Sequence, residues 1–483
     1  MNRREGSVSW LGSLFGAVLL LLVCAPRRAA AVPSFSRQTG MSCSFCHTVF
    51  PGLTAEGRKF KLLGYVTSAD SGDASTWKQS APASGPSVQA SGGDSGDDEG
   101  QGSLPILASA PIGASIQISD NFLARPANDS SGNPVSWTAS SGSDGMGVAQ
   151  LPTAVSLFYA GRIASKAGAF IQATYDSDSG VFHLDSMTDV RYADEAQVDG
   201  TDLIWGLTAN SAPTMQDVWN TVPMWSFPYL TSTISPMAAA GTRLDDMGAA
   251  GNEGGLGAYA YWNDLLYTEI AGYRSTPQGG GSYLAIQGVA PYWRVALQHG
   301  WDDDVQSLEV GTLGFAESTY PSGVLPQGPT DQFTDLAFDT QYQYVGDSNL
   351  VTGHAIFIHE NQDRGYSFGN GASSNSADNL QSFRVDGSYY YHRKVGFTIG
   401  YFDTEGSTDA LLYPQMAFMG SADNSPLTRG LVYELNYVPA VNTKLTLQYR
   451  SYLDFNGSSG NYDGAGRNAE DNNTLMAIAW LGY

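Results

Sequence analysis

The sequence predicts a mainly β protein, a transmembrane β-barrel of about sixteen strands in a bacterial outer membrane, behind a small N-terminal α-helical module. Three observations support this fold class. Apolar and polar residues alternate with a period of two along most of residues 105–483. Short and long connections alternate between these segments, as in outer-membrane barrels. Only 15% of the 483 residues are charged, and the chain contains 56 glycines and 26 tyrosines.

The first 31 residues have the features of a secretory signal peptide. Arg3 and Arg4 precede an apolar run over residues 11–24, and three alanines at 29–31 offer a cleavage site before Val32. We expect the mature chain to divide into a module at 32–66, an acidic linker rich in Ser, Gly and Asp at 67–104, and the barrel at 105–483. The composition of the linker predicts a disordered tether.

The module contains Cys43-Ser-Phe-Cys46-His47, the C-x-x-C-H signature for covalent attachment of one c-type haem. Thioether bonds from Cys43 and Cys46 would hold the porphyrin, and His47 would be the proximal ligand of the haem iron. After removal of the signal, these are the only two of the chain's three cysteines that remain. A disulfide between them is the alternative in an exported protein, but it gives His47 no role.

A helix of about two turns is expected after this motif. Thr54 is a suitable N-cap, and Gly64 is a suitable residue to end the helix. Arg58 and Lys61 on this helix are candidate partners of the haem propionates, and ordinary surface charges are the alternative. The module is basic whereas the whole chain has a net charge of -23, which favours docking of the module onto the barrel. About 35 residues are too few to enclose a haem, so the barrel must complete its pocket.

The predicted strands number sixteen, an even count as bacterial barrels require. Tight turns such as residues 262–264 and 392–394 are expected on the periplasmic side, and the long connections, including 123–154 and 211–254, outside. A soluble β-sandwich or propeller is the competing interpretation. The predicted segments are 110–122, 155–164, 169–176, 181–193, 201–210, 255–263, 265–275, 283–299, 303–319, 333–347, 349–363, 379–392, 394–406, 429–440, 443–455 and 473–483.

The sequence does not fix the distal haem ligand. On the segment 181–193, His183 and Met187 fall on the polar face that would point into the lumen, and either is a candidate. Met41 and the absence of a distal ligand are the alternatives. The negative net charge argues against nucleic acid as a partner and favours cations, which carboxylates in the lumen would concentrate.

Several motifs resemble the outer-membrane monohaem cytochrome–porin fusions, which are proposed iron oxidases. The resemblance is carried around the haem motif by residues 32–40, by Pro51-x-Leu-Thr54 and by Gly57-Arg58-x-Phe60-Lys61-Leu-x-Gly64-Tyr65. It continues at 161–163, 169–172 and 213–220, and the linker looks like an insertion relative to the family. Membership would carry over Cys43, Cys46 and His47 as haem-binding residues.

The resemblance implies an enzyme of the outer membrane that oxidises extracellular Fe²⁺. Electrons would pass through a single haem, held by the barrel, to a periplasmic cytochrome or copper protein, with no catalytic side chains beyond the haem. Two alternatives remain open. One is a general electron conduit for another donor or acceptor, and the other is a diffusion porin whose haem module acts as a gate or sensor.

Overall fold

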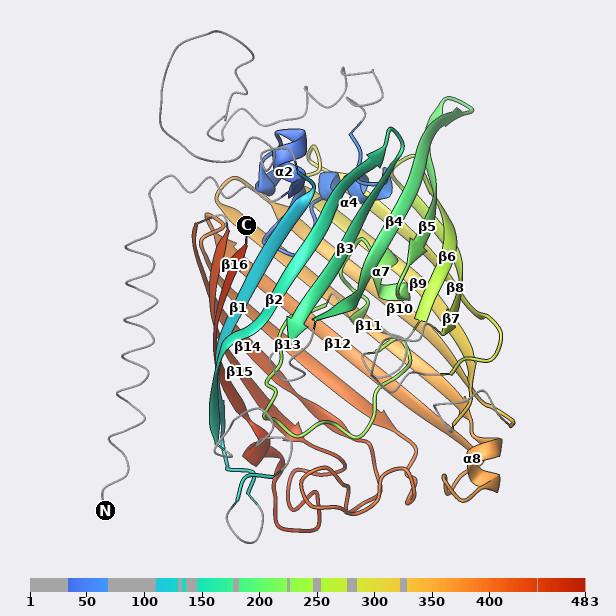
Figure 1. Cartoon of the computed structure of the whole chain (residues 1–483), viewed down its shortest axis with the longest axis vertical. Helices are drawn as coiled ribbons and strands as arrows, with labels where there is room; N and C mark the ends of the chain where they lie inside the picture. Colours follow the sequence, from blue (N-terminus) through green and yellow to red (C-terminus); the bar gives the residue numbers. More distant parts are fainter. Residues whose placement is uncertain are drawn as a thin grey trace. The chain divides into compact units, whose positions relative to one another are not determined.

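Sixteen antiparallel strands form a closed barrel in which β1 pairs with both β2 and β16 (Figure 1). The computed structural model describes residues 34–67, 110–128, 133–135, 146–176, 182–223, 226–245, 253–275, 285–321, 328–440 and 442–482. The strands are β1 (Ile112–Leu123), β2 (Gly147–Ala164), β3 (Ala167–Asp176), β4 (Phe182–Val198), β5 (Thr201–Asn210), β6 (Glu253–Trp262), β7 (Leu266–Ser275), β8 (Ala290–Trp301), β9 (Gln306–Thr319), β10 (Asp331–Val345), β11 (Asn349–Asp363), β12 (Ala377–Tyr391), β13 (Val395–Gly406), β14 (Thr428–Ala440), β15 (Thr443–Asp454) and β16 (Thr474–Gly482).

The predicted barrel of sixteen strands is therefore confirmed, and most strand ends lie within three residues of their predicted positions. The largest differences are the start of β2, at Gly147 rather than 155, the start of β8, at Ala290 rather than 283, and the end of β4, at Val198 rather than 193. In β2 the register against β1 shifts between Gln117 and Ser119, and such an irregularity interrupts the period-two pattern on which the prediction relied.

The connections alternate between short and long, as predicted. Several of the short ones are hairpin turns with consecutive residues of positive φ, such as Asn263 and Asp264 at 54° and 51° and His392 and Arg393 at 48° and 56°. Two consecutive positive φ angles match the right-handed twist of the flanking strands. All short turns meet at one end of the barrel, which is the end of the C-terminus and of the helical module (Figure 1).

The outer surface of the barrel is an apolar belt. Residues alternate between buried and exposed along most of β8 and the first half of β10. Exposed apolar side chains include Ile270 at 67%, Phe338 at 56% and Leu435 at 58%. Aromatic residues such as Tyr389, Tyr391 and Tyr437 are also exposed near the short turns. A closed barrel with an apolar exterior leaves no backbone group unpaired in lipid, and the protein lies in the bacterial outer membrane.

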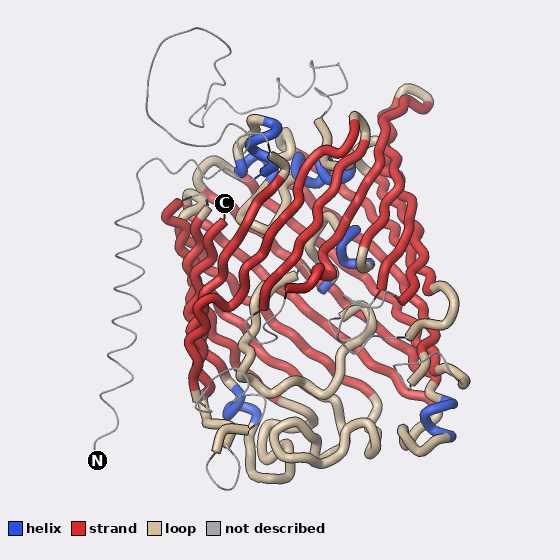
Figure 2. Tube along the Cα trace, viewed as in Figure 1, coloured by secondary structure: helices blue, strands red, loops and turns tan. Residues whose placement is uncertain are grey.

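The described helices are short: α2 (Ser34–Thr39), α3 (Cys43–Cys46), α4 (Ala55–Leu62), α7 (Pro213–Gln216), α8 (Gly365–Gly369) and the 3-10 helix η3 (Ala469–Asn472). In the described part of the chain, none has the length and apolarity that a membrane-crossing helix requires. Helices α2, α3 and α4 form the N-terminal module (Figure 2).

The connection between β5 and β6 enters the lumen, which corrects the prediction that this long segment lies outside. Residues 212–222 are buried, and we call them the plug. Trp219 of the plug packs with Leu62 and Leu63 of the module and with Tyr259, Tyr261 and Tyr267 of the wall. The plug carries apolar side chains, and their removal from water favours its burial.

Candidate functional site: the haem-binding motif in the mouth of the barrel

The haem-binding motif forms a single turn of helix followed by an extended residue. Helix α3 places Cys43 and Cys46 three residues apart, so both thiols lie on one side of the turn. Both cysteines are free and half-buried. Burial, together with the neighbouring Cys43 and Glu56, raises the pKa of Cys46 to about 12.

Helix α4 packs closely against this turn. The Thr54 side chain accepts a hydrogen bond from the Gly57 N–H at 3.1 Å, which confirms the predicted N-cap. A Cβ atom on Gly57 would lie 2.0 Å from the Cys46 carbonyl oxygen, so only glycine permits this approach. Gly64 has a φ of +72° after the helix, as predicted for a terminating residue.

His47 leaves the turn in an extended conformation and forms an isolated β-bridge with Leu53. Its Nδ1 atom is buried and has no hydrogen-bond partner among the described residues. Burial lowers the pKa of the imidazole, and the backbone groups of Gly52 and Pro51 act in the opposite direction. The neutral imidazole is the form that binds metal.

These residues fit a covalently bound haem c. The donor set contains two thiols on one helical turn and an adjacent neutral imidazole, which is the chemistry that haem c requires. The Phe50 ring lies 5.4 Å from His47 and 5.1 Å from Trp480 of β16, measured between ring centroids. Apolar surface for a porphyrin is therefore available from both module and barrel.

Arg58 fastens the module to the barrel wall. Its guanidinium is buried and donates to Gln341 at 3.0 Å, to Gln343 at 2.7 Å and to Ser307 at 3.2 Å (side-chain oxygens). Burial lowers the pKa of Arg58 to about 10. Only its Nε atom lacks a partner among the described residues, so a propionate contact stays a prediction.

Lys61 fastens the module to the plug. Its ammonium group donates to the carbonyl oxygens of Met215 at 2.6 Å and Asp217 at 2.8 Å. Burial, together with the nearby Arg191, lowers the pKa of Lys61 to about 8. Lys61 thus uses two of its three donors on the plug, and its predicted role at a propionate has no support from these contacts.

Contacts at both ends of the module complete the docking. The Tyr65 hydroxyl donates to Asp189 of β4 at 2.6 Å, and the Tyr259 hydroxyl donates to the Leu62 carbonyl. On the other side of the mouth, Arg393 in the turn between β12 and β13 donates to the carbonyl oxygens of His47 and Thr48. The predicted docking of the basic module onto the acidic barrel is confirmed.

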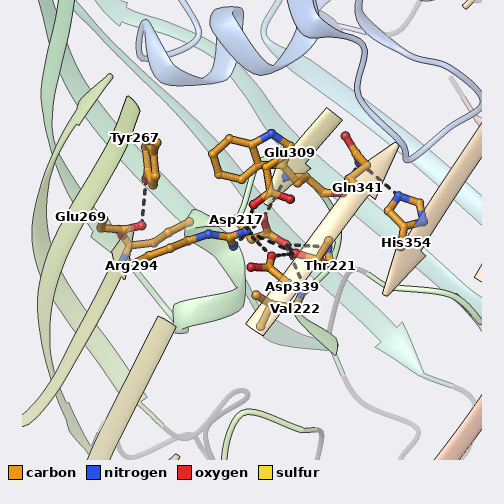
Figure 3. Close-up of polar contacts among 12 residues, drawn as sticks. Asp217, Thr221, Val222, Tyr267, Glu269, Arg294, Glu309, Asp339, Gln341 and His354 are labelled. Atoms are coloured by element: carbon orange, nitrogen blue, oxygen red, sulfur yellow. Dashed lines mark hydrogen bonds and ion pairs between the residues drawn. The ribbon is translucent and has the colours of Figure 1, made fainter. Parts of the chain in front are cut away.

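The plug is anchored by a buried charge network, shown in Figure 3. Arg294 of β8 donates to Asp217 of the plug at 2.9 Å, to Glu309 of β9 at 3.3 Å and to Asp339 of β10. Asp217 also accepts the backbone N–H groups of Trp219, Thr221 and Val222, which folds the plug back on itself. Breaking such a buried network leaves a charge without compensation, so the plug is held firmly.

The structure does not bring the candidate distal ligands to His47. The module meets β4 at Asp189, whereas the backbone of His183 lies six residues further along the strand, about 20 Å away. The side chain of His183 is outside the described atoms, and no described contact joins Met187 to His47. The distal ligand stays a prediction. Within the described residues, no three His, Cys, Asp or Glu side chains are grouped as ligands of one metal ion.

Two pockets remain along the wall formed by β11 to β15. The inner pocket, of about 410 Å³, is lined by Thr48 and Phe50 of the module and by Glu434 and Lys444 of the wall. The outer pocket, of about 540 Å³, lies toward the long loops and is lined by residues that include Arg384, Asp386, Phe402 and Arg450. Phe227 and His354 line both pockets, so they stand between them.

Sequence reasoning missed the residues that join module, plug and wall. Arg393, Asp217 and Arg294 were not singled out, although Asp217 lies within the resembling segment 213–220. An apolar segment inside a long connection was the available signal for the plug. The signal peptide at 1–31 and nearly all of the linker at 67–104 lie outside the described residues, so those boundaries stay predictions.

Comparison with known proteins yields structural similarity only. No family model and no curated protein matches the chain. OmpF of Salmonella typhi, solved in complex with daunomycin, is 12% identical, with a TM-score of 0.46 over 77% of this chain and 97% of its own. The outer-membrane channel DcaP of Acinetobacter baumannii, 12% identical, covers 77% and 96% with a TM-score of 0.42. The anion-selective porin of Comamonas acidovorans, 12% identical, covers 77% and 98% with a TM-score of 0.42.

The fold assignment rests on the strand pairing, because similarity at this level of identity and TM-score adds no argument to it. The chain is a porin-like outer-membrane β-barrel. None of the comparisons bears on the haem motif or on the cytochrome–porin fusions, which remain a resemblance carried by the motifs.

Proposed function

We propose that this protein is an outer-membrane cytochrome that oxidises extracellular Fe²⁺ and delivers the electrons to a periplasmic cytochrome or copper protein. The observation that carries the proposal is the position of the C-x-x-C-H motif, in the short-turn mouth of the barrel. One haem c bound there would supply a one-electron redox couple. Cys43 and Cys46 would hold it covalently, and His47 would ligate its iron.

The fastening of the module supports this proposal. Arg58 binds the wall, Lys61 binds the plug and Arg393 holds the His47 carbonyl. These contacts would keep the haem-bearing turn at the periplasmic end, where a soluble acceptor has access. Fe²⁺ would approach from the long-loop end, and the described acidic residues of the lumen would favour a cation.

The test is reduction of the haem by Fe²⁺ in purified, haem-loaded full-length protein. We expect the haem absorbance to change to that of the reduced form when Fe²⁺ is added, with one electron taken up per chain. The Cys43→Ala variant is expected to insert its barrel, to lack covalent haem and to lose Fe²⁺ oxidation. Oxidation at the wild-type rate by Cys43→Ala in isolated outer membranes would contradict the proposal.

A diffusion porin with a regulatory haem module is the second candidate. The porin-like barrel is the established part of the structure, and it agrees with this function directly. The two pockets along β11 to β15 favour it, since the described residues leave space there. Planar-bilayer recording separates the candidates. A large, permanently open pore in haem-loaded protein supports the porin, and a closed barrel supports the electron conduit.

A further inference from the structure

Among the described residues that line the outer pocket, Arg450 is a basic group without an ion-pair partner. Four basic or acidic groups line it: His354, Arg384, Asp386 and Arg450. His354 Nδ1 lies 3.0 Å from Asp386, and Arg384 pairs with Asp245 of the connection between β5 and β6. Within the residues that the structure describes, no ion pair involves Arg450, so its guanidinium can receive a ligand.

The surroundings of Arg450 hold its guanidinium ready. The Cζ atom lies 4.8 Å from the centroid of Phe402 and 5.7 Å from that of Tyr452, so the planar group is flanked by aromatic rings. Its cross-strand neighbours are Val432 and Thr474, which carry no charge. The Nε atom is buried and has no hydrogen-bond partner among the described residues. A buried donor without a partner costs free energy, which an acceptor would recover.

We infer that the outer pocket binds a small organic anion that carries one carboxylate. Guanidinium groups bind carboxylates through two parallel hydrogen bonds, so one unpaired guanidinium suits a ligand with one carboxylate. Phe227, Ile356 and Phe402 provide an apolar lining for the body of the ligand.

The proposal does not depend on haem or on Fe²⁺, and its test measures binding alone. Benzoate is the probe, titrated calorimetrically into purified full-length protein in detergent, with benzyl alcohol as the uncharged control. We expect benzoate to bind at least tenfold more tightly than benzyl alcohol or inorganic phosphate. Equal affinity for phosphate would overturn the organic ligand, and undetectable benzoate binding would overturn the site.

Substitutions locate the site. Arg450→Gln keeps most of the side-chain volume and is expected to weaken benzoate binding at least tenfold, whereas Arg450→Lys retains the charge and part of the affinity. Arg429→Gln is the matched control, since Arg429 is exposed and pairs with Asp454 away from the pocket. Unchanged binding in a folded Arg450→Gln variant, or equal losses in both variants, would contradict the assignment. If Arg450→Gln does not fold, the comparison of benzoate with benzyl alcohol on the wild-type protein still decides.

Discussion

Arg393 and His47 connect the barrel to the haem-binding motif: one Nη atom of Arg393 donates to the His47 carbonyl oxygen at 2.9 Å and to that of Thr48 at 2.8 Å. Arg393 lies in the three-residue turn between β12 and β13 and has a φ of 56°, so its backbone is fixed by the hairpin. The motif is thereby held by a residue 346 positions later in the chain.

Loss of Arg393 is expected to loosen the motif. Arg393→Ala removes two charge-assisted hydrogen bonds at a partly exposed site, which is worth about 1–2 kcal/mol of docking free energy. Hydrogen–deuterium exchange of the amides around His47 should become about tenfold faster. Lys394→Ala, at the exposed neighbouring position of the same turn, is the control and should leave exchange unchanged.

Two adjacent residues on α4 should behave in opposite ways. Arg58→Ala leaves Gln341, Gln343 and Ser307 without their donor and should weaken docking by about 3 kcal/mol. Lys59→Ala removes a solvent-exposed ion pair of 3.4 Å with Asp264 and should change docking by less than about 0.5 kcal/mol. The hydrogen–deuterium exchange rates of the α4 amides measure the change in docking free energy in each variant. Similar rates in the two variants would show that Arg58 does not anchor the module.

Docking should strengthen as the pH rises above 8. The pKa of Lys61 is about 8 when docked and 10.5 ordinarily, so the undocked module binds more protons between these values. The docking free energy becomes more favourable by an amount that approaches about 3 kcal/mol near pH 10.5. Protection factors of the α4 amides, corrected for intrinsic exchange, measure it. In Lys61→Met this component of the pH dependence should vanish, and an unchanged profile in that variant would refute the assignment.

The approach of α4 to the haem motif should not tolerate a side chain at residue 57. Gly57→Ala would place a Cβ atom 2.0 Å from the Cys46 carbonyl, so α3 and α4 must separate. Covalent haem per barrel, measured by absorbance, should fall below about a tenth of the wild-type value, a change of more than 1.4 kcal/mol in module stability. Gly387→Ala, where no atom lies within 4 Å of the new Cβ, is the control.

Removal of the Phe227 ring should join the two pockets. Phe227→Ala deletes the side chain between the outer and inner pockets, so single-channel conductance in planar bilayers should rise several-fold. Phe338→Ala, on the lipid-facing surface, should not alter conductance. An unchanged conductance in Phe227→Ala would mean that another constriction closes the lumen.

The sequence was sufficient for the strands because each strand carries its own signal. The segment 349–363 was predicted with the bounds of β11, since its alternation ends at turns on both sides. Thr54 and Gly64 likewise fixed the ends of α4 through local backbone chemistry.

Local sequence patterns could not predict the docking contacts. Arg58 binds Gln341, 283 residues later, and no period or spacing in the sequence relates the two. From the sequence, we placed Lys61 on the surface or at a haem propionate. Its actual partners are backbone carbonyls, which every residue has, so no sequence pattern could identify them. We predicted that the plug lies outside the barrel because long connections usually do, and we gave less weight to the apolar residues within 213–222.

The module is far in sequence from the residues that it contacts, and this determines the order in which the parts of the protein assemble. The module precedes β1, yet Ser34 binds Ala160 of β2, Lys61 binds the plug, and His47 is held by the turn after β12. Its docking surface does not exist until most of the barrel has been synthesised and closed. Docking therefore follows the closure of the barrel. Until then the two cysteines remain accessible to the periplasmic machinery that would modify them.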